Sequence, residues 1–293
     1  MDMRTFNSQI GTMLVYEPGQ SAEEIKAIIE GNDFCGLRID LIFEGEIPKD
    51  RSIFRELNFL KALSWNVVSE ISFDFLYTYD QLQFLAVQTM FSPIDFDQLR
   101  QIEHLSITWN KKMIKNLSSL ENLKTLGIVD YDELDLLPIS ELINIKRLRI
   151  STGKCKSLKG IENLKALEVL SLGAFRSLNE LKGVQNLQNL KFLEMDMCPK
   201  VTDYSPLSGL ENLKVLELLD CKGLSSISFV SDLTKLEQLT LLGSTKVGDN
   251  NLKPAKNVKR VYYNHKKDYN LDLRDKEIQG ERVSYFNYSS SLY

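Results

Sequence analysis

The stretch "NLKVLELLDCKGL", residues 212–224, decides the fold of this chain. Its leucines follow the spacing apolar-x-x-apolar-x-apolar, and nearly the same string stands upstream as "NLKFLEMDMCPKV", residues 189–201. The template occurs nine times, and its middle residues, evenly spaced along the chain, are Leu85, Leu105, Leu126, Leu148, Leu170, Leu193, Leu216, Leu239 and Val261. So regular a period predicts a stack of similar units.

Each unit combines two periodicities. In "VLELL" (215–219) apolar residues alternate with others, which predicts a short strand with one buried face. The apolar residues that follow are three apart, as at Leu224, Ile227 and Val230, which matches the three residues per turn of a 3₁₀ segment. A single unit buries too little apolar surface to offset its backbone entropy, so neighbours must stack against one another.

The pattern L-x-x-L-x-L-x-x-C-x-x-L, present at 213–224 and at 190–201, resembles the leucine-rich repeat, and "VTDYSPLSGLENL" (201–213) resembles the short repeats of internalins. The resemblance implies an α/β fold, a right-handed curved solenoid with a parallel β-ladder on the concave face and 3₁₀ or irregular segments on the convex face. The ninth position of the repeat is cysteine in two units, Cys198 and Cys221. We therefore expect no asparagine ladder. The other turn positions carry Tyr131, Gly153, Phe175 and Ser244.

The sequence divides into three parts. Residues 81–264 form the solenoid of about nine units, and 265–293 a C-terminal cap or tail. Residues 1–80 are irregular, and we expect a divergent N-terminal cap with degenerate repeats. Within it, "SAEEIKAIIEGND" (21–33) predicts a helix with a capping box, and "GLRIDLIF" (36–43) and "VVSEISFDF" (67–75) predict strands around a helical "IFRELNFLKAL" (53–63).

Composition and motifs argue against an enzyme. The chain has two histidines, His104 and His265, far apart in the repeat order, and no phosphate-loop, dinucleotide-binding or hydrolase motif. We therefore expect no catalytic residue, metal or cofactor. A formal net charge of −4 argues against a nucleic-acid partner. No secretory signal, membrane span or CxxC pair is recognisable, so we expect a cytoplasmic protein with four reduced thiols and no membrane partner.

The strand residues that flank the buried positions should form columns on the concave face. Acidic side chains of neighbouring strands converge there beside apolar ones, which resembles the apolar core and charged rim of an interface. Arginines and aromatic residues are favoured interface anchors. The predicted protein-binding residues are Trp109, Arg147, Arg149, Phe192, Glu194, Asp196, Val215, Glu217, Leu219, Asp220 and Tyr262.

These observations favour a non-enzymatic module that binds another protein, whose matching patch would be basic and apolar. A sharper alternative is an immunity or antitoxin-type inhibitor of a toxin. An internalin-like surface adhesin is disfavoured because no signal or anchor is recognisable. An enzyme using Cys155 or the acidic cluster ranks last. The sequence leaves the partner and the oligomeric state open.

Overall fold

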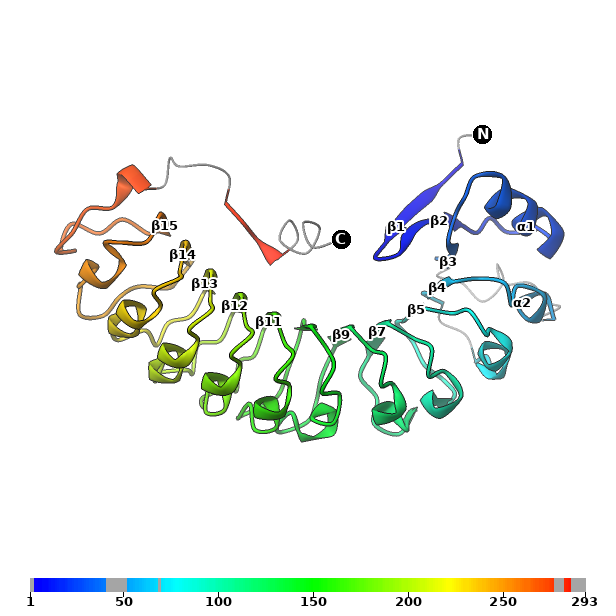
Figure 1. Cartoon of the computed structure of the whole chain (residues 1–293), viewed down its shortest axis with the longest axis horizontal. Coiled ribbons are helices and arrows are strands. Elements are labelled where there is room, and N and C mark those ends of the chain that lie inside the picture. The colour runs from blue at the N-terminus through cyan, green and yellow to red at the C-terminus, as the bar shows by residue number, and fades with distance from the viewer. Residues whose placement is uncertain (1–2, 41–51, 68–69, 277–281, 286–293) are drawn as a thin grey trace. The chain divides into compact units, whose positions relative to one another are not determined.

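The computed structural model describes residues 3–40, 52–67, 70–276 and 282–285. The chain forms two compact units, Met1–Val129 and Asp130–Tyr293, which are described in turn (Figure 1). In the described residues, no helix is long and apolar enough to cross a bilayer.

The N-terminal unit begins with an antiparallel hairpin and continues as a parallel ladder. The hairpin consists of β1 (Thr5–Ser8) and β2 (Gly11–Val15), and the parallel ladder continues from β2 through β3 (Gly36–Ile39), β4 (Ala62–Trp65), β5 (Phe84–Val87), β7 (His104–Thr108) and β9 (Thr125–Val129). A two-stranded sheet pairs β6 (Ile94–Asp95) with β8 (Ile114–Lys115). The helical elements are α1 (Ala22–Gly31), α2 (Ile53–Glu56), η2 (Asp74–Thr78), η3 (Phe96–Gln98) and η4 (Leu117–Ser119).

The capping box predicted at residue 21 is confirmed. The Glu24 backbone N–H donates to Ser21 Oγ at 3.2 Å, and the Ser21 N–H donates to Glu24 Oε2 at 2.8 Å. The strand predicted over 36–43 is confirmed as β3; residues 41–43 lie outside the described part of the chain. The rungs β2, β3 and β4 fall within the residues assigned to the cap, and the three-part division remains a prediction.

Two element predictions between positions 1 and 80 are wrong. The helix expected over 53–63 ends at Glu56, and its last two residues begin β4. The described residues of 67–75 contain no strand, and η2 begins at Asp74. Alternating aromatics there suggested a strand face, but Phe73 and Phe75 pack from a turn around Trp65, with ring centroids 6.0 and 5.7 Å away.

The C-terminal unit is a ladder of six parallel strands with 3₁₀ turns on its opposite edge (Figure 1). The strands are β10 (Arg147–Ile150), β11 (Val169–Gly173), β12 (Phe192–Asp196), β13 (Val215–Leu219), β14 (Gln238–Leu242) and β15 (Arg260–Tyr263). The turns are η5 (Leu137–Ile139), η6 (Ile161–Asn163), η7 (Val184–Asn186), η8 (Ser205–Gly209), η9 (Ser228–Asp232), η10 (Lys253–Ala255) and η11 (Arg274–Lys276).

The repeat predicts the register of this ladder correctly. Leu170 pairs with Leu193, and Leu193 pairs with Leu216, so the middle residues of successive units lie side by side and are buried. The apolar residues spaced by three fall in or beside 3₁₀ turns, as Leu207 does in η8. Both periodicities inferred from the sequence are therefore confirmed in this unit.

A left-handed residue follows each strand from β11 to β14. Ala174, Met197, Asp220 and Gly243 have φ values of 55°, 51°, 52° and 68° and recur once in each unit. The backbone N–H groups of Ala174, Met197 and Asp220 each extend the ladder by one more hydrogen bond, such as the one from the Met197 N–H to the Leu219 carbonyl at 2.9 Å. A non-glycine residue in this region costs about 1–2 kcal/mol.

Side-chain thiols and a hydroxyl take the place of an asparagine ladder. Cys221 Sγ lies 3.5 Å from the Met195 carbonyl oxygen and 3.4 Å from that of Leu219, so the thiol can donate to either. One unit later the equivalent donor is Thr245, whose hydroxyl reaches the Leu218 carbonyl at 3.0 Å. The repeat period aligns Ser244 with Cys221. This turn contains one extra residue, so Thr245 and not Ser244 donates the hydrogen bond.

In the turns that lack cysteine at this position, large aromatic side chains pack beside a glycine of the neighbouring turn. Tyr131 forms a β-bridge with Gly153, and the ring of Phe175 lies against Gly153 from the next unit. A Cβ on Gly153 would stand 2.4 Å from Phe175 Cζ, which is far inside van der Waals contact. Both aromatic rings are fully buried, so they fill the turn interior that asparagines would otherwise bridge.

Candidate functional site

Alternate residues of β10–β15 point away from the leucine core, and we call the surface that they form the strand face. The side chains of one column on this face are apolar on three successive strands: Val169, Phe192 and Val215. Apolar side chains turned away from the core need another cover. In this unit the chain itself supplies one.

The cover is the segment Arg282–Tyr285, which we call the tail segment. Val283 and Tyr285 pack against the apolar column, and in Figure 1 the segment lies on the strand side of the unit, opposite the 3₁₀ turns. Both side chains therefore cover the same apolar column.

Gln238 of β14 holds the backbone of the tail segment. Its Nε2 donates to the Val283 carbonyl oxygen at 2.7 Å, and its Oε1 accepts from the Val283 N–H at 2.9 Å. Gln238 is fully buried. The side-chain amide thus satisfies both backbone polar groups of one residue, as a neighbouring strand would.

Glu217 of β13 pairs with Arg282. The distance from Arg282 Nε to Glu217 Oε1 is 2.7 Å, and Glu217 is 0% exposed. Burial raises the pKa of the Glu217 carboxyl, and the Arg282 guanidinium partly offsets this effect. A buried carboxylate requires such a counter-charge to remain ionised at neutral pH.

Tyr285 rests between an arginine and an aromatic ring. The Arg149 guanidinium carbon lies 4.6 Å from the Tyr285 ring centroid, and the Phe192 ring meets Tyr285 edge-on at 6.3 Å. Both geometries are favourable for aromatic side chains. Side chains from five successive strands, β10 to β14, therefore contact this short peptide.

An acidic cluster adjoins this contact. Glu194 and Asp196 of β12 are half-buried, and Asp220 after β13 is exposed. Ser171 Oγ donates to Glu194 Oε2 at 2.7 Å, and Asp220 Oδ1 accepts the Ser244 N–H at 2.7 Å. Burial and the charges of Glu194 and Asp220 raise the pKa of Asp196. Glu194 and Asp220 thus have structural contacts as well as a place in the cluster.

The structure brings four of the eleven predicted site residues together around the tail segment: Arg149, Phe192, Val215 and Glu217. The sequence predicted that these four residues and Arg147 are exposed on the face. This is wrong for Arg147, Phe192, Val215 and Glu217, which are 6%, 0%, 3% and 0% exposed. The tail segment covers the last three. Leu219 and Tyr262 are partly exposed, and Trp109 belongs to the N-terminal unit and is buried.

Sequence reasoning missed Val169, Gln238 and the tail segment itself. The available signal was the apolar column, because three apolar side chains on the face away from the core imply a cover. "RVSY" (282–285) supplies apolar and aromatic side chains beside a basic one, yet nothing periodic links it to residue 217.

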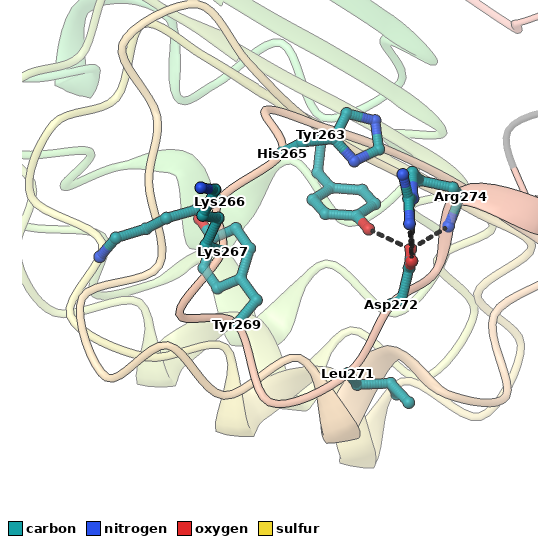
Figure 2. A pocket seen from close by; sticks show the side chains of 8 residues that line it. All are labelled: Tyr263, His265, Lys266, Lys267, Tyr269, Leu271, Asp272 and Arg274. Atoms are coloured by element: carbon teal, nitrogen blue, oxygen red, sulfur yellow. Dashed lines mark hydrogen bonds and ion pairs between the residues drawn. The ribbon is translucent and has the colours of Figure 1, made fainter.

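The C-terminal turn holds a separate cavity of about 300 Å³ (Figure 2). Asp272 lies in its wall, where its carboxylate accepts from Tyr263 Oη at 3.2 Å and pairs with Arg274. The Arg274 guanidinium holds the pKa of Asp272 well below its usual range. The Leu273 N–H also donates to Tyr263 Oη at 3.0 Å. These bonds tie the terminal turn to β15, a structural role.

Two observations on the described residues bear on metal binding and on thiol reactivity. Within them, no group of three or more histidine, cysteine, aspartate or glutamate side chains could hold a metal ion. Burial raises the pKa of the Cys155 thiol to about 12, which makes it a poor nucleophile at neutral pH.

No protein-family model matches the chain, and no curated protein matches it. The solved structures that resemble it include the following leucine-rich-repeat proteins. An internalin from Listeria monocytogenes has a TM-score of 0.50 and 23% identity over 72% of this chain and 68% of its own. TLR13 in complex with ssRNA13 has a TM-score of 0.50 and 18% identity, over 83% and 45% of the two chains. A Leptospira interrogans protein has a TM-score of 0.46 and 17% identity, over 85% and 76%. These likenesses concern the fold alone.

Proposed function

We propose that this chain, a leucine-rich-repeat solenoid by fold, is a non-enzymatic module that binds another protein through the strand face of its C-terminal unit. The observation that carries the proposal is the tail segment, a short peptide held by side chains of five successive strands. A face that holds one peptide in this way has the chemistry to hold another.

The composition of the face supports a protein partner. An apolar column lies at the centre, with an arginine and an aromatic ring beside it and carboxylates around it, as in protein interfaces. The carboxylates of Glu194, Asp196 and Glu217 favour a partner patch that is basic around an apolar centre. The same charges would repel phosphates, so we do not propose a nucleic-acid partner for this chain.

Charge reversal on the face tests the proposal. Full-length chain with Glu194→Lys and Glu217→Lys is immobilised, and captured proteins are quantified by mass spectrometry against wild type. The matched control is Glu211→Lys, which changes the charge of an exposed residue that follows η8. We expect at least one protein to fall about tenfold with the face variant and to remain with the control. Equal capture by all three chains would refute a role for this face.

An inhibitor of a toxin is a finer form of the same proposal, and a toxin-like reading frame beside the gene would favour it over a general scaffold. A surface adhesin stays a weaker alternative, because the likeness to an internalin is one of fold. The four cysteines are free in the structure, which suits the reducing cytoplasm that we propose as the compartment.

A further inference from the structure

We infer that the tail segment is a built-in competitor, and that it imitates the element the face recognises in a partner. That element is a short segment with an arginine, an aliphatic residue directly after it and an aromatic residue two positions further on. This inference rests on the proposed function, because it names the partner chemistry and the regulation of the same face.

Each feature of the imitated element meets its own group on the strand face. The arginine meets the Glu217 carboxylate, the backbone of Val283 meets the Gln238 amide, and the aromatic ring meets Arg149 and Phe192. These groups belong to four different strands. The segment therefore crosses the rungs of the ladder, and side chains of the face bind it. Addition of a strand to a sheet edge would instead rely on main-chain hydrogen bonds.

The face requires an occupant of this chemistry. Glu217 and Gln238 are completely buried beneath the tail segment, together with the apolar column. If the segment left and nothing replaced it, three apolar side chains would meet water. An occupant without a cation would leave the buried carboxylate unpaired. The pairing with Arg282 thus makes the face selective for a basic residue beside apolar ones.

The covalent link makes the tail segment a strong competitor. Only residues 277–281 separate it from η11, and a short tether gives an effective concentration on the order of 1 mM. A free segment of the same kind with a Kd of about 10 µM for the open face would then bind about 100-fold more weakly to the closed chain. To displace the tail segment, a partner must bind the open face tightly enough to overcome this loss of apparent affinity.

The test is a fluorescence anisotropy titration with a labelled peptide of residues 280–287, "GERVSYFN". It is titrated with full-length wild type and with full-length Arg282→Glu, which detaches the tail segment and leaves the face intact. We expect Arg282→Glu to bind the peptide about tenfold more tightly or better. Tyr285→Ala, a second tail variant, should act in the same direction. Lys267→Glu, in the turn that lines the cavity of Figure 2, is the matched control and should behave as wild type.

Peptide variants test the chemistry. Peptides with glutamate in place of the arginine, or alanine in place of the tyrosine, should lose binding to Arg282→Glu chain. Equal peptide affinity for wild type and both tail variants would overturn the inference, as would equal binding of a scrambled peptide. Sedimentation of the wild-type chain measures its oligomeric state, and so tests whether the tail segment on each strand face comes from a second copy of the chain. A dimer that Arg282→Glu dissociates would also overturn the built-in competitor.

The inference and the proposed function fail separately. If the peptide does not bind while capture of a protein still depends on Glu194 and Glu217, the function stands and the imitation fails. If the peptide binds as expected while capture is indifferent to those two charges, the tail segment closes a face that has no protein partner.

Discussion

Removal of the Arg282 guanidinium measures the energetic role of the buried ion pair. Glu217 is 0% exposed, and its Oε1 lies 2.7 Å from Arg282 Nε. The loss of one partner of a buried pair typically costs about 3–5 kcal/mol, because a charge is left buried without compensation. In this chain the tail segment can leave the face and admit water to Glu217. The cost of Arg282→Ala is therefore limited by the docking of this short segment, and we expect about 1–2 kcal/mol.

A double-mutant cycle separates the pair from the rest of the segment. Glu217→Gln should cost less in the Arg282→Ala background than in wild type, since no guanidinium is then left without its carboxylate. This holds whether the segment stays docked or leaves. The free energies of unfolding come from urea titrations of the four chains at pH 7, followed by circular dichroism. Costs that add within about 0.3–0.5 kcal/mol would refute the pairing.

The pH dependence gives an independent check. Burial already raises the pKa of Glu217, and while the tail segment of Arg282→Ala stays docked, the charge that offsets this rise is missing. A carboxyl whose pKa is raised in the folded state contributes stability below its unfolded pKa and loses it as the pH rises through the folded pKa. The penalty of Arg282→Ala should therefore be largest at pH 7 and shrink as the pH falls towards about 4. A penalty that is constant over this range would contradict the assignment.

Three further predictions concern the C-terminal unit. Met197→Gly should raise the free energy of unfolding by about 0.5–1 kcal/mol, because φ is 51° and the residue, at 39% exposure, lies outside the core; a lower urea midpoint would contradict this. Gly153→Ala should cost about 1–3 kcal/mol through its clash with Phe175, and less in a Phe175→Leu background; equal costs in the two backgrounds would argue against the clash. Asp196→Asn should raise Tm at pH 7, because burial and the charge of Glu194 raise the pKa of Asp196 and so disfavour its charged form. The gain should vanish near pH 3, where the carboxyl is protonated in both states, and a gain equal at both pH values would count against it.

The ladder was predictable because its information is local and repeated. One strand and one 3₁₀ turn recur in each unit, so a single template fixes which residues pair, as Leu193 does with Leu216. The errors arose where the period breaks. Phe73 and Phe75 alternate as in a strand but pack from a turn, and Thr245 takes over a role that the alignment gave to Ser244.

The strand face was predictable as a set of columns, and its occupant was not. Arg282 and Glu217 are 65 residues apart in the chain, and no repeat relates them. The columns showed which side chains leave the core, but not which of them the chain covers again. Phe192 and Val215 thus appeared to be open anchors, whereas the tail segment lies on them.

The packing of the Phe175 ring against Gly153 limits where further repeat units can be added to this chain. The ring of Phe175 occupies a space that exists only because the preceding turn lacks a Cβ. A tandem copy of the Phe175 unit would set one ring against another at the same place. The units that carry Cys198 and Cys221 have the same small side chain at this position and are equal in length, so one could be inserted beside the other without such a collision. A further repeat unit, added by gene duplication or by protein engineering, would therefore fit most easily between these two cysteines.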